Sequence, residues 1–319
     1  MSSRRFSGLA ALALAATCLY AQQASLDGPV SGLVYDGQSK ALRIIMGVPG
    51  AAFLGGELAG SLELASVSPD GRFALALSEG KLNLIRLDQP DAVWQLLDEH
   101  ARVERIAWSQ DSSAAAVAGD SRVTLWRNLA TQASRLDLDL PAEIGSLTAL
   151  AVHPEANSVA IATKGSVFYL DGQSKLVAQT SDASALLFDG ADLFLADRST
   201  DQILRIRGYA SSAELSLLAG AAMRIDDPVA INLAPGGASL MVAGGSSRSL
   251  LWIDRSTGEV SRSLDLDFEP VRLDRFSGVS PLFVLNDRAS ATDPVQILDG
   301  GAIPAVYFVP AGQASSVED

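Results

Sequence analysis

The feature that most constrains this chain is a repeat of about 40 residues. The clearest copy is "VSPDGRFALALSEGKLNLIRLD" at residues 67–88, in which a turn, an apolar strand, a tight turn and a second strand follow one another. Five further segments fit the same pattern. The residues that end the first strand of each copy are Val67, Trp108, Val152, Phe188, Leu233 and Arg275, and they lie 41, 44, 36, 45 and 42 residues apart. This regular spacing predicts an all-β chain built from small, similar antiparallel sheets.

A period of about 40 residues with short alternating strands is typical of a β-propeller blade. Each copy supplies strands a, b and c, and more polar segments such as 92–97 and 259–266 supply an outer strand d. Six copies are clear, and the hairpin at 31–48 and the strand at 304–310 remain. We therefore predict seven four-stranded blades, closed with strands from both termini because closure removes exposed sheet edges. The alternative is six blades with the hairpin packed outside.

The first 21 residues have the order of a secretory signal peptide, with Arg4 and Arg5, an apolar run, and Ala21 before Gln22 as the cleavage site. The apolar run is shorter than the roughly 20 residues of a spanning helix. We expect a secreted or periplasmic protein without stable membrane insertion. Lipidation at Cys18 is disfavoured because Thr17 stands where a small Gly or Ala is expected. The expected organisation is a signal peptide at 1–21, one propeller domain at 22–310 and a disordered acidic tail at 311–319.

The charge balance limits the partners. The chain has 24 basic and 37 acidic residues, a net charge of −13, and cleavage would remove two arginines and no acid. An acidic surface repels phosphate backbones, so nucleic acid is not expected as a partner. The one cysteine, Cys18, lies in the signal segment. The mature chain therefore has no disulfide, thiolate nucleophile or Cys-ligated metal, and its stability must come from core burial.

Several stretches resemble known repeat families. "SVSPDGRFALA" and "LWIDRSTGEV" (251–260) resemble blades of WD-repeat-like and YVTN-type propellers, and "LFLADRSTDQILRI" (193–206) is similar to NHL-type blades. The resemblance to such secreted bacterial propellers implies the fold and a general habit of binding ligands or proteins, but no particular substrate. The Gly-His pair of WD repeats is absent. The Trp-Asp pair keeps its aspartate in four copies, and its tryptophan only at Trp126 and, one position earlier, at Trp252.

Catalytic side chains are scarce. The two histidines, His100 and His153, fall on a connecting loop and in a turn whose counterpart in the first copy carries serine. These two histidines, with no further His or Cys in the mature chain, are too few residues to favour a Ser-His-Asp triad or an imidazole-rich metal site. "DRSTD" (197–201) and "DRSTGE" (254–259) sit at different points of their blades, so we interpret both as turn chemistry. This scarcity favours a non-enzymatic protein.

The b–c turns are the strongest candidates for a shared site. In a propeller these turns emerge on one face and, with the d–a loops, surround the opening of the central channel. The predicted ring at this opening consists of Glu79, Asp120, Lys164, Asp197, Arg198, Asn286, Asp287 and Arg288. The alternative is that Gly, Asp, Asn and Ser are simply the residues that tight hairpins require.

Two functions follow from this ring. The first is an exported, monomeric platform that binds a protein or a small polar ligand and needs no cofactor. The alternative is a metal-dependent lactonase or hydrolase in which Asp120, Asp197, Asn286 and Asp287 converge on a calcium-type cation, since such cations take oxygen ligands. The second reading requires those side chains to meet at one point.

Overall fold

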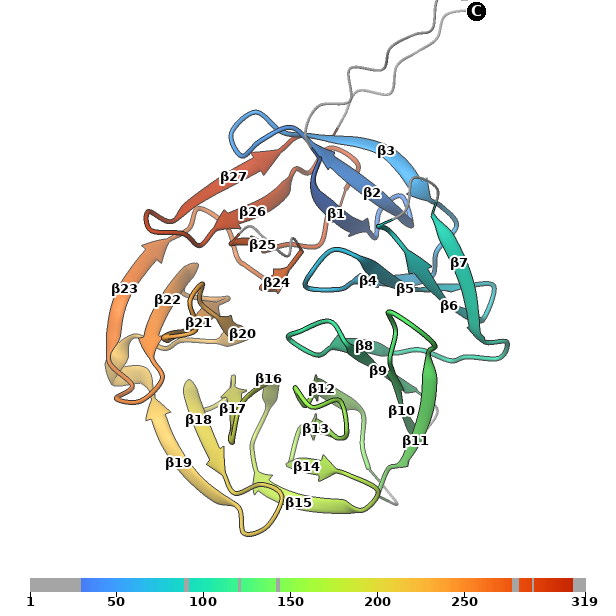
Figure 1. Ribbon diagram of the computed structural model, residues 1–319. Helices are drawn as coiled ribbons and strands as arrows, with labels where there is room; N and C mark the ends of the chain where they lie inside the picture. The colour runs from blue at the N-terminus through green and yellow to red at the C-terminus, as the bar shows by residue number, and fades with distance from the viewer. Residues whose placement is uncertain are drawn as a thin grey trace, which may run out of the picture.

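The computed structural model is a ring of seven blades around a common centre (Figure 1). The structure describes residues 30–88, 92–119, 122–141, 144–276, 281–288 and 290–311. Six blades are four-stranded antiparallel sheets, and the first blade contains three strands among the described residues. The prediction of seven blades is confirmed, and the 31–48 hairpin belongs to the ring rather than packing outside it. The proposed signal peptide and residues 312–319 of the proposed tail lie outside the described residues.

Each four-stranded blade runs outward from the centre of the ring in chain order. The inner strands are β4 (Leu64–Val67), β8 (Arg105–Trp108), β12 (Leu147–Val152), β16 (Ala183–Asp189), β20 (Pro228–Leu233) and β24 (Asp274–Arg275). The second strands are β5 (Phe73–Ser78), β9 (Ala114–Gly119), β13 (Val159–Thr163), β17 (Asp192–Asp197), β21 (Ser239–Gly244) and β25 (Leu282–Val284). The predicted strand ends at Val67, Trp108, Val152, Leu233 and Arg275 are confirmed, and β16 extends one residue beyond Phe188.

The outer half of each blade is less buried. The third strands are β6 (Lys81–Arg86), β10 (Arg122–Arg127), β14 (Ser166–Leu170), β18 (Gln202–Arg207), β22 (Ser249–Asp254) and β26 (Val295–Asp299). The outer strands are β7 (Val93–Asp98), β11 (Ser134–Asp139), β15 (Ser174–Gln179), β19 (Glu214–Ala219), β23 (Val260–Asp265) and β27 (Ala305–Val309). Blade 1 consists of β1 (Val30–Asp36), β2 (Ala41–Met46) and β3 (Phe53–Ala59). Among the described residues the one helical element, the 3₁₀ turn η1 (Ala221–Met223), is too short to cross a lipid bilayer.

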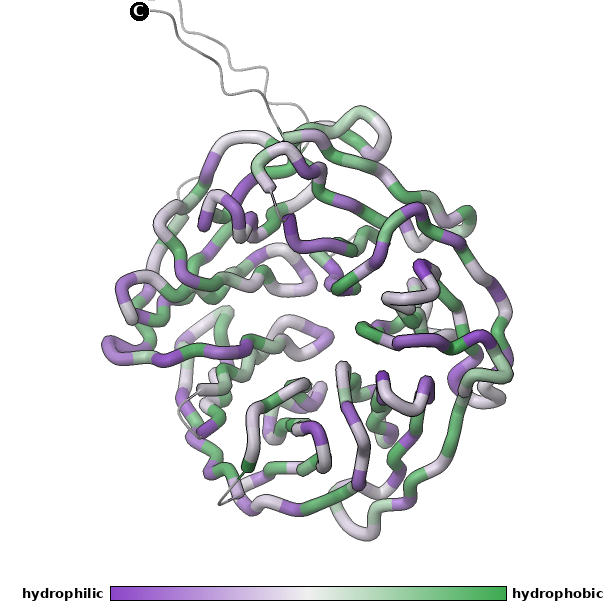
Figure 2. Tube along the Cα trace, turned by 180° about the vertical axis from the view of Figure 1, so that it is seen from behind, coloured by the Kyte–Doolittle hydropathy of each residue, from purple (hydrophilic) through white to green (hydrophobic). Residues whose placement is uncertain are grey.

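Strand alternation explains why the second strands are rich in small apolar residues. Successive side chains of a strand point to opposite faces of the sheet, and each blade is covered by a neighbour on both faces. In β9, Ala115 and Val117 pack with blade 2, whereas Ala114, Ala116 and Ala118 pack with blade 4. Hydrophobic and hydrophilic stretches accordingly alternate along the blades instead of forming one apolar side of the molecule (Figure 2).

The a–b turn of blade 2 shows how local sequence sets the strand register. The Ser68 hydroxyl donates to Asp70 Oδ1 at 2.6 Å and accepts from the Phe73 backbone N–H at 3.0 Å. Asp70 Oδ1 also accepts the Arg72 N–H at 3.0 Å, and Gly71 takes the positive φ of 72° that the turn requires. Blade 3 repeats the arrangement with Ser109 and Asp111. A short polar motif therefore determines where β5 and β9 begin.

The two ends of the described chain meet at blade 1. The backbone N–H of Leu54 in β3 donates to the Pro310 carbonyl at 3.1 Å, and Leu54 forms a single parallel bridge with Ala311. Asp36, at the end of β1, forms a buried ion pair with Arg288 of blade 7. The predicted closure between the termini thus takes the form of one bridge and one ion pair, and no described sheet shares full strands from both ends.

Candidate functional site: the central channel and its mouth

The central channel is lined by the inner strands and has two openings. We call the face that carries the b–c turns and d–a loops the mouth face, and the face that carries the a–b turns the far face. The half of the channel toward the mouth face has a volume of about 680 Å³ and is lined by residues such as Gly37, Glu104 and Thr148. The half toward the far face has about 210 Å³ and ends at Pro69 and Gln110. The two halves share much of their apolar lining.

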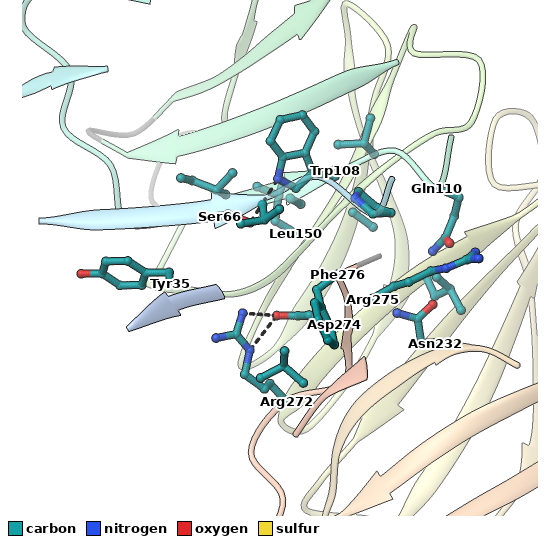
Figure 3. Close-up of a pocket in the computed structure, with 18 of the residues that line it drawn as sticks. Tyr35, Ser66, Trp108, Gln110, Leu150, Asn232, Arg272, Asp274, Arg275 and Phe276 are labelled. Atoms are coloured by element: carbon teal, nitrogen blue, oxygen red, sulfur yellow. Dashed lines mark hydrogen bonds and ion pairs between the residues drawn. The ribbon is translucent and has the colours of Figure 1, made fainter. Parts of the chain in front are cut away.

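Polar side chains of the inner strands form hydrogen bonds that join neighbouring blades. Trp108 Nε1 donates to Ser66 Oγ at 3.1 Å across blades 3 and 2 (Figure 3). Asn232 Nδ2 donates to the Leu273 carbonyl at 2.9 Å, and Arg105 Nε donates to the Leu147 carbonyl at 2.8 Å. These bonds give partners to polar groups that are partly removed from water. They also hold the inner strands at fixed positions around the channel.

Arg272 is a charged residue of the channel lining that is paired with two carboxylates. Its guanidinium forms ion pairs with Asp274 and, at 2.7 Å, with Asp287 (Figure 3 shows the Asp274 pair). The Arg272 side chain is 24% exposed, while that of Asp287 is 71% exposed. Burial acts to lower the pKa of Arg272, but attraction to the two carboxylates outweighs it and the pKa is raised. Arg272 therefore stays charged and compensated by its neighbours.

A second pair lies between blades 5 and 6 on the same face. Arg198 Nε contacts Asp227 Oδ1 at 2.7 Å, and Asp227 Oδ2 accepts the backbone N–H and the hydroxyl of Ser246, each at 3.1 Å. Burial acts to raise the pKa of Asp227, but the hydrogen bonds from Arg198 and Ser246 more than offset it, so the pKa is lowered. These groups border a hollow of about 410 Å³ beside the channel.

The structure distributes the predicted ring over different environments. Asp197 is 2% exposed and accepts hydrogen bonds from Ser199 of its own turn and from Thr180 and Ser181 of the loop between β15 and β16. Burial acts to raise the Asp197 pKa, but these hydrogen bonds lower it overall. Asn286 spans its own hairpin by bonding to the Pro294 carbonyl and the Gln296 N–H. These two side chains are engaged in shaping turns.

The remaining predicted residues divide further. Arg288 is buried in its ion pair with Asp36 and donates to backbone carbonyls of its own loop. Glu79 and Lys164 are exposed on turns. Arg198 and Asp287 do lie at the mouth, within the ion pairs described above. Asp120 lies outside the described residues. A ligand-binding role for this set stays a prediction.

The carboxylates proposed for a cation site do not form a group. Within the described ranges, no three or more His, Cys, Asp or Glu side chains are placed together as metal ligands. Asp197 is tied into its turn on blade 5, and Asp287 pairs with Arg272 on blade 7. The two "DRST" strings follow the prediction of turn chemistry, because Asp254 accepts the Ser256 N–H at 2.9 Å as Asp197 accepts the Ser199 N–H at 3.1 Å.

Sequence reasoning missed the polar residues in and just before the inner strands. Arg272 and Asp274 occur in "VRLDR" (271–275), where other copies are mostly apolar, and Trp108 stands where other copies have a smaller residue. This interruption of an apolar strand was the available signal. The b–c turn residues were predicted instead, because these turns are polar in every copy. The pairing of Arg272 with Asp287, which are 15 residues apart, depends on the blade geometry.

Comparison with known proteins supports the fold. Searches of protein-family models and of curated proteins found no match to this sequence. The β-propeller domain of Cps50 (Swd1) from Myceliophteria thermophila is similar at 15% identity, with a TM-score of 0.53 over 82% of this chain and 94% of that chain. A chain in the crystal structure of a nidogen–laminin complex is similar at 14% identity, with a TM-score of 0.50 over 73% of this chain and 93% of that chain. The chain is therefore a β-propeller.

Proposed function

We propose that this chain is an exported, non-enzymatic β-propeller that binds a partner protein at its mouth face, with Val271 at the centre of the contact. The observation that carries the proposal is that Val271 is 53% exposed where the channel mouth meets the neighbouring hollow. An apolar side chain surrounded by polar groups is the usual anatomy of a protein-binding surface. The hollow and the channel mouth together are bordered by six carboxylates and four guanidinium groups.

The charges around Val271 suit recognition better than chemistry. Arg198 pairs with Asp227, Arg248 pairs with Glu269 at 3.2 Å, and Arg272 pairs with Asp287. Charges that are already paired and partly exposed contribute to specificity at the rim of an interface more than to affinity. One of the similar structures, that of the nidogen–laminin complex, is itself that of a protein complex, which is consistent with this use of the fold.

Export follows from the N-terminal sequence. The order of basic residues, apolar run and small residue at positions 4–21 supports cleavage after Ala21. N-terminal sequencing of protein recovered outside the cytoplasm should begin at Gln22. Recovery of an intact Met1 terminus from the cytoplasm alone would contradict export while leaving the binding proposal open.

The binding proposal is tested by site-specific cross-linking. A photo-reactive amino acid is placed at Val271 or Glu269 on the mouth face, or at Asn157 on the a–b turn of the far face. We expect one partner to be captured from both mouth positions and not from Asn157. The captured partner is then identified by mass spectrometry, purified, and titrated against the propeller to obtain a Kd.

Two matched variants make the result specific. Val271→Asp should raise the Kd about tenfold or more, because it places a charge at the apolar centre of the contact. Val93→Asp, at a residue 48% exposed on the outer strand β7, should leave it unchanged. Equal capture from both faces, or equal affinity of the two variants, would contradict the proposal.

A further inference from the structure

Two charged side chains that border the hollow beside the channel have no ion-pair partner in the described part of the chain. The charged residues that line this hollow of about 410 Å³ are Arg105, Asp182, Arg198, Asp227 and Glu269. The last three belong to the ion pairs Arg198–Asp227 and Arg248–Glu269. Arg105 and Asp182 form no ion pair with a described residue, and they are too far apart to pair with each other. The hollow therefore presents one positive and one negative charge to a ligand.

Arg105 begins β8 in blade 3, and its guanidinium reaches across to blade 4. Its Nε donates to the Leu147 carbonyl at 2.8 Å, while Nη1 and Nη2 have no acceptor among the described residues. Burial lowers the pKa of Arg105, and attraction to Glu104 offsets only part of the effect. An arginine in a protein nevertheless stays charged. Its two Nη groups can therefore donate to both oxygens of a carboxylate, the strongest geometry for such a pair.

Asp182 lies in the loop before β16 and is half-buried. Its backbone is fixed, because its N–H donates to Asp197 Oδ1 at 3.3 Å and its carbonyl accepts the Arg198 N–H at 3.0 Å. Its carboxylate accepts no hydrogen bond from a described residue. The hydrogen bond to Asp227 is the largest cause of the raised pKa of Arg198, and attraction to Asp182 is a smaller one. Asp182 therefore supplies a positioned acceptor whose hydrogen-bonding capacity is unused.

The hollow also has an apolar wall. Val229 and Val271 line both the hollow and the channel mouth, and Ala183 and Pro270 line the hollow. Pockets for small molecules have volumes of about 300–1,000 Å³ and combine an apolar lining with a few convergent polar groups. The hollow, at about 410 Å³, is within this range. Its size and lining suit a small ligand with an apolar skeleton.

We propose that this hollow binds a zwitterion, a small molecule that carries a carboxylate and an ammonium group on one apolar skeleton, as an α-amino acid or a short peptide does. The carboxylate binds the Nη groups of Arg105, and the ammonium group binds the carboxylate of Asp182. The skeleton packs against Val229 and Val271. This inference goes beyond the proposed protein partner and does not depend on it.

A ligand with a single charge suits the hollow less well. A carboxylate at Arg105 without an ammonium group would leave Asp182 unpaired and add a negative charge beside it. An ammonium group at Asp182 without a carboxylate would leave Arg105 unpaired. Because a ligand displaces water from both side chains, a charge that it leaves unpaired costs free energy. Both charges of the ligand should therefore contribute to its affinity.

The first test titrates ligands into the purified mature protein, beginning at Gln22, without any partner protein. Isothermal titration calorimetry gives Kd values for the standard amino acids and for dileucine. We expect zwitterions with apolar side chains to bind. Tighter binding of an amino acid than of dileucine would identify a single amino acid as the ligand class, and the reverse would identify a short peptide. No binding of any of these zwitterions would overturn the proposal.

Analogues that lack one charge test the roles of the two groups. For leucine, isopentylamine lacks the carboxylate and isocaproate lacks the ammonium group. Each analogue should have a Kd about tenfold or more above that of the zwitterion, since each loses one charge-assisted hydrogen-bonded contact. An analogue that binds as tightly as its zwitterion would contradict the assignment of two charges.

Variants of the two side chains assign each charge to its partner. Arg105→Gln should raise the Kd of the zwitterion about tenfold and remove its advantage over the amine analogue, while Asp182→Asn should remove its advantage over the acid analogue. Arg122→Gln and Asp139→Asn, at exposed positions of blade 3 outside the hollow, are the matched controls and should leave the Kd unchanged. Equal Kd values for the variants and their controls would overturn the proposal.

Discussion

At the scale of single residues, the structure depends on close packing at the junction of the first and last blades. A Cβ atom on Gly32 would lie 2.3 Å from Cδ2 of the Phe276 ring and 3.1 Å from the Phe276 carbonyl oxygen. Phe276 is 3% exposed and packs among Val34, Ile45 and Val284, so its ring has little room to move. The absence of a side chain at Gly32 is what lets blade 7 approach β1.

Gly32→Ala should therefore lower the free energy of unfolding by about 1–3 kcal/mol, the usual cost of overpacking a core. Gly56→Ala is the matched control, because Gly56 is at an exposed position of β3 and a Cβ there would meet no atom within 4 Å. Denaturant unfolding of both variants measures the difference. Equal stability of the two would show that Phe276 can move aside without cost.

At the scale of elements, an aromatic cluster joins blades 4 and 5. His153, in the turn after β12, lies 5.1 Å from Phe188 between ring centroids, and its Nε2 is 2.9 Å from the Tyr209 hydroxyl. Tyr209 donates to the Gly190 carbonyl at 3.0 Å, and the Glu155 N–H donates to His153 Nδ1 at 3.2 Å. This arrangement suits a neutral imidazole that donates from Nε2 and accepts at Nδ1.

The pKa shifts agree with that arrangement. Burial lowers the pKa of His153 below its ordinary value, with Glu155 offsetting only part of the effect. Burial, with smaller contributions from Tyr169 and Glu155, raises the pKa of Tyr209 to about 12. Both side chains are therefore neutral at pH 7. The interface between blades 4 and 5 is built for the uncharged histidine.

Stability should consequently fall as the pH is lowered from 7.5 to 5.5. Because the folded-state pKa of His153 is below the unfolded value of about 6.5, the unfolded chain binds more protons in this window and gains relative to the folded one. His153→Gln should reduce the pH dependence of the Tm between these limits. His100→Gln, at an exposed loop position, should leave it intact. An unchanged slope in His153→Gln would contradict this assignment.

At the scale of the whole molecule, the ring is closed by residues that are 252 positions apart in the chain. The side chains of Arg288 and Asp36 are 4% and 0% exposed, and Arg288 also donates to the Asp293 carbonyl at 2.7 Å. Arg43 adds a second positive charge 3.7 Å from Asp36. A buried ion pair of this kind depends on both partners, since either charge alone would remain uncompensated.

Removing one partner should therefore be costly. Arg288→Met should lower the free energy of unfolding by about 3–5 kcal/mol, and the double variant with Asp36→Asn should lose less than the sum of the two single changes. Arg198→Met breaks a partly exposed pair at the mouth and should cost about 1 kcal/mol or less. Denaturant unfolding tests all of these. Similar losses for Arg288→Met and Arg198→Met would mean that the Arg288–Asp36 ion pair does not stabilise the closed ring.

The mouth itself was only partly predictable. The repeat placed Arg198 and Asp287 on the correct face, because every b–c turn emerges there once the strand register is known. It could not show that Asp197 bonds to Thr180, or that Arg288 turns inward to Asp36. Turn residues look alike in sequence, and their partners come from neighbouring segments or from the opposite end of the chain. Val271 and Arg272 were not predicted as mouth residues, because they lie before the inner strand β24 and outside the b–c turns.

The sequence by itself determined the repeat, the order of strands within a blade and the turn chemistry, because these depend on the alternation of apolar residues and on contacts within a few residues, such as Ser68 with Asp70. Only the tertiary structure decided which charged side chains are buried and which are exposed, and how the ring closes. The physical reason is that burial and ion pairing in a closed ring depend on residues brought together from distant parts of the chain.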